Sequence, residues 1–222
     1  MATMAMSLRV VVPPHPLIGH WLTVLRDRHT PQPLYGTAMT ELGRWLTYEA
    51  IREWLPHRRL TISTDRGETE GEVIDTSVPL LALPLLRTGL GLWDGARAVL
   101  PSARIALPLL SGRGAVDGLP AAIEPRCGVL VFIDQVATGA RLLHLLRALA
   151  ELGVEGRRLR VVTALTASPG LKLLGEQVPD LTLYTACIDA ELTDEGLIQP
   201  GIGTVATRLF GEPSLEAGGR PA

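Results

Sequence analysis

The spacing of apolar residues changes in character near residue 78 of the chain. Before that point, apolar residues recur with helical spacing over 15–27 and again over 34–54, which predicts two helices separated by a proline-containing break. Between residues 59 and 75, apolar and polar residues alternate instead. This alternation predicts a β-hairpin with its turn at 65–70, forming a small flap beside the main sheet. The front of the chain is therefore expected to be helical apart from this flap.

From residue 78 onward, continuous apolar runs alternate with amphipathic segments. Such runs are typical of strands in a parallel sheet whose two faces are both covered by helices, so we predict an α/β fold of this kind. The predicted strands are 78–86, 103–110, 127–134, 159–167 and 181–189, and the predicted helices are 91–100, 139–152 and 170–177. The helix at 139–152 places Leu142, Leu145, Leu146 and Leu149 on one face and is followed by Gly153, a common helix terminator.

Three loops follow the carboxyl ends of predicted strands, where parallel sheets bind ligands. They begin after Pro84, Ile133 and Ile188, and each of them contains glycine. The second loop runs into the helix at 139–152, whose free N–H groups would favour an anion. On these residues alone, an ordinary helix cap by Thr138 with Gly139 in the turn remains an alternative.

Length and composition indicate one globular domain. The chain has 222 residues, of which 46% are hydrophobic and 20% charged, and we expect a single domain over 1–211 followed by a disordered tail at 212–222. The net charge of -2 provides no bulk attraction for nucleic acid or for an anionic membrane. The basic patches at 57–59 and 157–160 lack interleaved aromatic residues, so we interpret them as solvated faces rather than an RNA-binding surface.

The cysteines and the N-terminal segment point to a reducing compartment. Cys127 and Cys187 lie far apart without CxxC spacing, so neither a zinc site nor a disulfide framework is predicted, and both are expected to be small buried hydrophobes. The first ten residues lack the pattern of a secretory leader, and no apolar run approaches the length of a membrane span. A cytoplasmic protein without membrane insertion is expected.

Several segments together resemble the uracil phosphoribosyltransferases, most closely the bacterial and cyanobacterial ones. They are "PPHPLIGHWLTVLRDRHTP", "TELGRWLTYEAIREWLP", "PLLRTGLGLWDGA", "ATGA", "YTACIDAEL", "GLIQPGIG" and "RLFG", in the order and spacing of that family over about residues 8 to 211. The resemblance implies a type I phosphoribosyltransferase fold with a hood over the base. It implies a reaction of uracil with 5-phosphoribosyl 1-diphosphate (PRPP) and Mg²⁺, which gives UMP and diphosphate. It also implies a homodimer or a higher symmetric oligomer.

Two loops carry the PRPP site that the resemblance implies. In the first, Arg87 stands where a family arginine holds the pyrophosphate, and Thr88 and Gly89 follow it; a surface ion pair is the alternative role for Arg87. In the second, the family has an acid and a proline before Leu-Ala-Thr-Gly-Gly-Ser. Here Ile133 replaces the acid and Asp134 replaces the proline. The PRPP-binding residues implied for this loop are Asp134, Ala137, Thr138, Gly139, Ala140 and Arg141, with Arg87 and Asp134 as the catalytic pair.

The second PRPP loop departs from the family where the 5'-phosphate should bind. Ala140 and Arg141 replace glycine and serine, which removes a hydroxyl donor and adds a long cationic side chain that could also attract a phosphate. Acidic residues at the second acid position of related enzymes bind ribose hydroxyls, so Asp134 could partly serve. The resemblance therefore implies a PRPP loop that is degenerate rather than absent.

The base-binding loop implied by the resemblance recognises uracil mainly through main-chain groups. The matching positions are Leu197, Ile198, Gly203 and Thr204. Leu197 replaces a tyrosine, and Thr204 and Thr207 replace two aspartates of the family pattern, so that only Arg208 of the charged set remains. The flap that covers PRPP in the family is shortened here to about residues 109–126. Arg113 could replace its arginine, or the segment could be a plain connection.

Two hypotheses about function follow. In the first, the chain is a uracil phosphoribosyltransferase homologue whose degenerate PRPP loop leaves weak or no transferase activity, with Mg²⁺ needed only together with PRPP and no metal site in the protein itself. In the second, it is a catalytically inactive member that acts as a regulatory or protein-assembly subunit. The missing groups favour weak catalysis, because loss of one preorganised charge-stabilising group typically costs on the order of 10²- to 10³-fold in rate.

Overall fold

A parallel sheet forms the centre of the protein, in a computed structural model that describes residues 7–111 and 115–211. The strand order is β1-β10-β9-β8-β4-β5, with β11 added to β9, and every pairing is parallel. The strands are β1 (Arg9–Val11), β4 (Leu80–Pro84), β5 (Arg104–Ile105), β8 (Gly128–Val136), β9 (Leu159–Ala167), β10 (Thr182–Thr185) and β11 (Ile188–Asp189). The predicted parallel α/β fold is confirmed. The tail predicted to be disordered lies outside the described residues.

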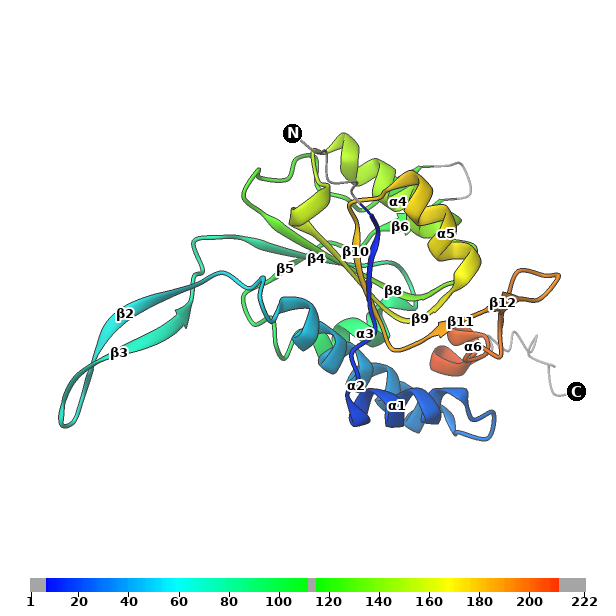
Figure 1. Ribbon diagram of the computed structural model, residues 1–222, viewed down its shortest axis with the longest axis horizontal. Helices are drawn as coiled ribbons and strands as arrows, with labels where there is room; N and C mark the ends of the chain where they lie inside the picture. The colour runs from blue at the N-terminus through cyan, green and yellow to red at the C-terminus, as the bar shows by residue number, and fades with distance from the viewer. Residues whose placement is uncertain (1–6, 112–114, 212–222) are drawn as a thin grey trace, which may run out of the picture.

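Helices cover both faces of the sheet (Figure 1). On one face lie α1 (Pro16–Arg26), α2 (Gln32–Ile51) and α3 (Gly89–Ala96), and on the other lie α4 (Ala140–Glu151) and α5 (Ser168–Gln177). Each face has its own cluster of buried apolar side chains. The central strands β4 and β8 are buried along nearly their whole length, which explains why their sequences are continuous apolar runs.

The helix predicted after β8 forms as expected. The four leucines that share one face of α4 are all buried. Gly153 has a φ of 73°, its N–H donates to the carbonyl of Ala150, and the N–H of Val154 donates to the carbonyl of Leu149. A residue with this φ is strained unless it is glycine, so Gly153 ends the helix as predicted.

Two predicted strands are interrupted in the structure. The run 103–110 contributes only β5 to the main sheet, because Pro108 has no N–H to continue the ladder; β6 (Leu109–Leu110) instead pairs antiparallel with β7 (Val116–Asp117). The run 181–189 is divided into β10 and β11, and β11 pairs with β9. Predictions of unbroken strands at these places were wrong.

The predicted β-hairpin forms, but its turn is shorter than expected. Strands β2 (His57–Thr64) and β3 (Gly67–Ile74) are joined by two residues, and the pattern Glu-Thr-Glu belongs to β3 rather than to the turn. The hairpin forms a two-stranded sheet of its own and projects away from the rest of the protein (Figure 1). The expectation of a front that is helical apart from the hairpin also missed β1, whose three residues are ordered by pairing with β10.

Glycines allow α2 and α3 to pack with their backbones in contact. A Cβ added to Gly43 would lie 1.9 Å from the carbonyl oxygen of Leu92, and one added to Gly95 would lie 1.7 Å from the carbonyl oxygen of Thr40. No rotation of a side chain can relieve a clash with a main-chain oxygen. The close approach of these two helices therefore requires glycine at both positions.

Substitution of Gly95 by alanine is expected to lower the free energy of unfolding by about 2–3 kcal/mol, because the added methyl group forces the two helices apart. Gly36→Ala is the matched control, because Gly36 lies in α2 with open space around it; it should be neutral or stabilising by up to about 1 kcal/mol. Urea unfolding of both variants measures the difference. Equal stabilities would show that the two helices tolerate a wider separation.

Candidate functional site

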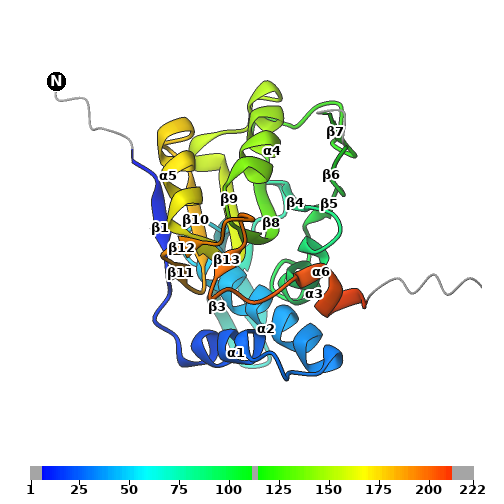
Figure 2. The same ribbon diagram turned by 90° about the vertical axis from the view of Figure 1, so that its right-hand side faces the viewer.

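The carboxyl ends of β4, β8 and β11 bring the three predicted loops to one edge of the sheet. In front of this edge lie β12 (Glu191–Leu192), β13 (Ile198–Gln199) and α6 (Val205–Phe210), as Figure 2 shows. The N–H of Leu85 in the first loop donates to the carbonyl of Phe132 in β8 at 2.8 Å. Segments far apart in the sequence therefore form one candidate site.

The first loop is packed tightly against β8 by its glycine. A Cβ on Gly89 would lie 2.4 Å from the carbonyl oxygen of Phe132, so only glycine permits this contact. Thr88 is buried beside it, whereas Arg87 is exposed. The guanidinium carbon of Arg87 lies 5.4 Å from the ring centroid of Phe210 in α6, and within the described part of the chain no carboxylate forms an ion pair with it. The cationic group is thus oriented by an aromatic ring and not neutralised.

Asp134 is a buried carboxylate with an unsatisfied oxygen. Its side chain is only 5% exposed, and Oδ1 has no hydrogen-bond partner among the described residues. Burial raises the pKa of Asp134, while the Thr88 hydroxyl and the Arg141 charge act in the opposite direction. An unpaired buried carboxylate is costly, so its presence at the end of a strand points to a ligand-binding role.

Ile133, at the place of the family acid, has a structural role. Its side chain is 2% exposed and belongs to the apolar cluster beneath α4 and α5. Because side chains alternate along a strand, Ile133 and Asp134 point to opposite faces of the sheet. Asp134 therefore faces the side of the sheet where Thr88 lies, and Ile133 faces the apolar cluster beneath α4 and α5.

The loop between β8 and α4 encloses a hollow of about 110 Å³, here called the phosphate-loop hollow. It is lined by Ile133, Asp134, Gln135, Val136, Ala137, Thr138, Gly139, Arg141 and Leu142. The N–H of Ala140, the first residue of α4, donates to the Thr138 hydroxyl at 3.4 Å. Ala140 and Arg141 are exposed at the start of the helix. This hollow thus brings together the residues that the sequence assigned to PRPP binding in this loop, except Ala140, which is not part of its lining.

Gly139 is required by packing as well as by its backbone conformation. It is the N-cap of α4 with a φ of 82°, and a Cβ on it would lie 2.9 Å from the carbonyl oxygen of Gly170. Gly170 in α5 is reciprocally close, because its own Cβ would lie 2.4 Å from the carbonyl oxygen of Ala137. The start of α5 therefore supports the loop between β8 and α4, a role that the sequence alone did not suggest for Gly170.

A second hollow of about 250 Å³, here called the hood hollow, adjoins the first. It is lined by Gln135, Thr193, Leu197, Ile198, Gln199, Pro200, Gly203 and Thr204, which include all four residues predicted to bind uracil. The main chain of Leu197 is engaged in its own turn, since its N–H donates to Thr193 Oγ1 at 3.3 Å and its carbonyl accepts from the Thr193 N–H at 2.8 Å. Gly203 has no main-chain hydrogen-bond partner among the described residues. Its peptide groups are therefore free for a ligand.

An ion pair that the sequence did not reveal holds the base of the hood. Asp189, 6% exposed, accepts hydrogen bonds from Arg26 at 2.6 and 3.0 Å and from the N–H of Gly201 at 3.0 Å, and Arg26 also donates to the carbonyl of Gly201 at 3.0 Å. An acid directly after a buried strand could have indicated Asp189. No local pattern could have indicated Arg26, because it is 163 residues away in the sequence.

Arg208, the retained charged residue of the family pattern, holds the hood to α1. Its guanidinium donates to the carbonyls of Leu25, Asp27 and Ile202 and lies 4.1 Å from the ring centroid of Tyr35. These contacts use the end of α1, whose last carbonyls need donors. The side chain is thus engaged in structure and does not point freely into the hollows.

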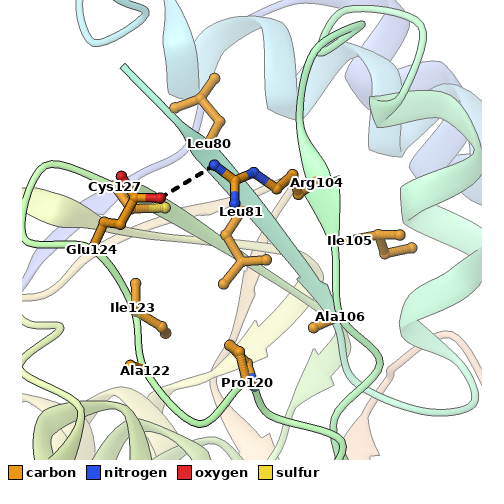
Figure 3. Close-up of a pocket in the computed structure, with 10 residues that line it drawn as sticks. All are labelled: Leu80, Leu81, Arg104, Ile105, Ala106, Pro120, Ala122, Ile123, Glu124 and Cys127. Atoms are coloured by element: carbon orange, nitrogen blue, oxygen red, sulfur yellow. Dashed lines mark hydrogen bonds and ion pairs between the residues drawn. The ribbon is translucent and has the colours of Figure 1, made fainter. Parts of the chain in front are cut away.

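Another hollow of about 210 Å³ lies at the edge of the sheet (Figure 3). It is lined by Leu80, Leu81, Arg104, Ile105, Ala106, Pro120, Ala122, Ile123, Glu124 and Cys127. Leu80 and Leu81 begin β4, so this hollow is remote from the carboxyl ends of the strands. It is largely apolar, and its charged pair, Arg104 and Glu124, is joined at 3.3 Å. Burial raises the pKa of the Cys127 thiol, which makes it less reactive. This hollow is not the candidate site.

The described residues contain neither a cluster of three or more His, Cys, Asp or Glu side chains that could hold a metal ion nor a helix long and apolar enough to cross a membrane. Asp134 is the carboxylate lining the phosphate-loop hollow. A divalent cation there would therefore need most of its oxygen ligands from a bound substrate.

Substitution of Asp189 by asparagine is expected to lower the free energy of unfolding at pH 7 by about 2 kcal/mol, because it removes the charge that accepts the hydrogen bonds from Arg26 and the Gly201 N–H. Burial alone would raise the pKa of Asp189, but the bonds from Arg26 and Gly201 outweigh it and lower the pKa. A carboxyl with a lowered pKa stabilises the folded state above its unfolded value, near 4, and loses this effect as the pH falls through its folded value.

The loss caused by Asp189→Asn should therefore shrink in urea unfolding measured at pH 3. Asp194→Asn is the control, because Asp194 is exposed in the same segment. A loss that is the same at both pH values would contradict the assigned ion pair.

For Asp134, the pH dependence of the free energy of unfolding is expected to have the opposite sign, and Asp134→Asn tests this. Since burial raises the pKa of Asp134, the folded protein loses stability as the pH rises through the unfolded value, near 4, toward the folded one. The asparagine variant lacks this loss, so it should be at least as stable as the wild type at pH 7. A variant clearly less stable at pH 7 than at pH 4, relative to the wild type, would show that the carboxylate has a structural partner.

Comparisons with known proteins agree with this geometry. The family model for uracil phosphoribosyltransferase matches residues 12–212. The uracil phosphoribosyltransferase of Synechococcus elongatus is 46% identical over 217 residues, covering 95% of this chain and all of that protein, and the enzyme of Nostoc sp. is 43% identical over 94% of this chain and all of that protein. The solved structure of the AQ2163 protein from Aquifex aeolicus has a TM-score of 0.80 at 26% identity, covering 91% of this chain and 98% of that one. The resemblance recognised in the sequence is thereby confirmed, and the chain belongs to the uracil phosphoribosyltransferase family.

Proposed function

We propose that this protein binds PRPP and uracil at the candidate site and transfers the phosphoribosyl group to uracil slowly. One observation carries the proposal: Gln135 lines both the phosphate-loop hollow and the hood hollow. The two hollows are therefore neighbours. A ribose held at the first can present its C1' atom to a base held at the second, which is the arrangement that a transfer between them requires.

The residues divide the substrate between them. Arg87, cationic and without an ion pair among the described residues, binds the pyrophosphate, with Thr88 and Gly89 shaping its loop. The free N–H groups at the start of α4 and the Thr138 hydroxyl bind the 5'-phosphate. The carboxylate of Asp134, which lines the phosphate-loop hollow, accepts a ribose hydroxyl, and the free peptide groups of Gly203 bind an edge of uracil.

In the transfer, the bond between C1' and the pyrophosphate oxygen breaks and a bond from uracil N1 to C1' forms, while the N1 proton passes to the departing pyrophosphate. Positive charge develops on the ribose and negative charge on the leaving pyrophosphate. Arg87 stabilises the negative charge on the pyrophosphate. Asp134 holds the ribose in place and faces its positive charge. Mg²⁺, arriving with PRPP, would supply further charge neutralisation, with Asp134 as the carboxylate available to it.

Three departures from the family pattern support slow turnover. Arg141 extends a long side chain from the first turn of α4, where the 5'-phosphate needs space. Ile133 supplies no carboxylate, and Thr204 supplies a hydroxyl in place of an acid. Because each such group is worth on the order of 10²- to 10³-fold in rate, the combined loss is expected to be large, although such losses do not simply add. Arg113, considered as a replacement for the flap arginine, lies outside the described residues.

The same departures support a second candidate, a catalytically inactive protein that serves as a regulatory or assembly subunit. In this candidate the fold is retained for binding a ligand or a partner protein. A cytoplasmic homodimer or higher oligomer is part of both proposals, on the basis of the resemblance. Turnover separates the two candidates.

Calorimetric titration with Mg²⁺ and PRPP, followed by an assay of UMP formation beside the Synechococcus elongatus relative, tests the proposal. We expect that PRPP binds and that the turnover rate is at least about 10²-fold below that of the relative. Asp134→Asn should weaken PRPP binding about 10-fold or more, which corresponds to roughly 1.4 kcal/mol. Absence of PRPP binding at millimolar concentration would overturn the enzymatic proposal, and binding without UMP formation would favour the second candidate.

Restoration of family residues should improve the site. Arg141→Ser together with Thr204→Asp is expected to raise PRPP affinity, because space for the 5'-phosphate and an acid beside the ribose are regained. The full restoration that includes Ile133→Asp should raise affinity further but lower the free energy of unfolding, since Ile133 packs in the apolar core. Calorimetry and urea unfolding measure the two effects. Unchanged affinity in both variants would assign the defect to the shortened flap instead.

A further inference from the structure

A polar hollow at the amino ends of the strands has features of an anion site. It measures about 240 Å³ and is here called the arginine hollow; Arg9, Arg52, Trp54, Arg160 and Tyr184 line it. Arg9 begins β1 and Arg160 is the second residue of β9. From there to the end of β9 at Ala167 the strand rises by roughly 23 Å. The arginine hollow is therefore at the opposite end of the sheet from the candidate site.

The strand register places two of these arginines side by side. Arg9 pairs with Thr182 of β10, and Thr182 pairs with Arg160 of β9. Paired residues of parallel strands point to the same face, so both arginines flank Thr182 on one face. Their Cα atoms are two strand spacings apart, about 10 Å. Two like charges are thus held at a distance that a single small anion can bridge with both side chains.

Arg160 is fixed in position but not neutralised. Its Nη1 donates to the carbonyls of Leu159 at 2.9 Å and Arg157 at 3.3 Å, and its guanidinium carbon lies 5.4 Å from the Trp54 ring centroid. Its Nε is buried and has no hydrogen-bond partner among the described residues. Burial lowers the pKa of Arg160, Tyr184 opposes this, and Arg9 adds to the lowering. An anion between the arginines would reduce the repulsion between them.

The acids at the hollow do not supply that anion. Glu49 is engaged with Arg52 at 2.5 Å. Glu53 lines the hollow but forms no ion pair among the described residues, and no carboxylate there pairs with Arg9 or Arg160. Three arginines and two glutamates line the hollow, a net charge of +1, and neither Arg9 nor Arg160 is paired, so the hollow favours an anion that accepts hydrogen bonds from both.

We propose that the arginine hollow binds the phosphate dianion of a small phosphate ligand between Arg9 and Arg160. Guanidinium groups match tetrahedral phosphate oxygens with paired hydrogen bonds. The Tyr184 hydroxyl adds a donor at the floor, since Tyr184 is 8% exposed and lines the hollow. The ligand is either free phosphate or a phosphate monoester. The site is distinct from the PRPP site and does not depend on transferase activity.

Amide chemical shifts of the full-length protein, titrated with inorganic phosphate at constant ionic strength, test this site separately from the phosphate loop. Shifts at Arg160 and Thr182 should saturate. Arg9→Gln should raise the dissociation constant read at these amides about 10-fold or more and leave the constant read at Gly139 to Arg141 unchanged. Arg9 is exposed, so its loss does not threaten the fold. Arg157→Gln is the control, with the same charge change at an exposed residue that does not line the hollow.

Three results would overturn the proposal. The first is that the phosphate-induced shifts are confined to the phosphate loop. The second is that Arg9→Gln and Arg157→Gln have equal effects at Arg160 and Thr182. The third is that acetate, a monoanion, binds as tightly as phosphate at these amides. Titration with glycerol 3-phosphate identifies the source of the phosphate: tighter binding than inorganic phosphate supports a monoester, and weaker binding supports the free ion.

Discussion

The burial of β8 on both faces is the constraint on which the candidate site depends. Because helices cover each side of the sheet, the side chains of β8 alternate between two dry cores until the strand ends. A carboxylate on β8 can line a ligand site only near the end of the strand, where its last residues meet the loop. The register of β8 therefore decides that residue 134, and not residue 133, presents the acid of this chain.

Two buried aspartates near that end illustrate opposite solutions to the same physical problem. Asp189 is fully paired by Arg26 and the Gly201 amide, so its charge contributes to stability and holds the hood. Asp134 keeps an oxygen without a partner, so its charge opposes folding. Such a group at the end of a strand is a candidate for ligand binding. The contrast separates a carboxylate that is paired within the fold from one that is not.

Elements that are governed by local pattern could be predicted from the sequence, and elements governed by distant contacts could not. The apolar runs of β4, β8 and β9 were recognisable because burial on both faces leaves few polar positions, and the leucine face of α4 was recognisable by its spacing. By contrast, β1 has three residues and is ordered by β10, while Pro108 divides a run that looks continuous. For the site, the predicted parallel topology was enough to place the three loops at one edge of the sheet. The contacts of Arg26, Gly170 and Arg208 depend on tertiary packing, which no local spacing records.

The contact between Gly139 and Gly170 has a consequence for how motifs in this family are interpreted. The glycine of the Ala-Thr-Gly turn is held by the backbone of α5 whether or not a phosphate binds. A descendant that lost catalysis altogether would still need both glycines in order to fold. Survival of this turn in a relative is therefore evidence of inherited architecture rather than of chemistry.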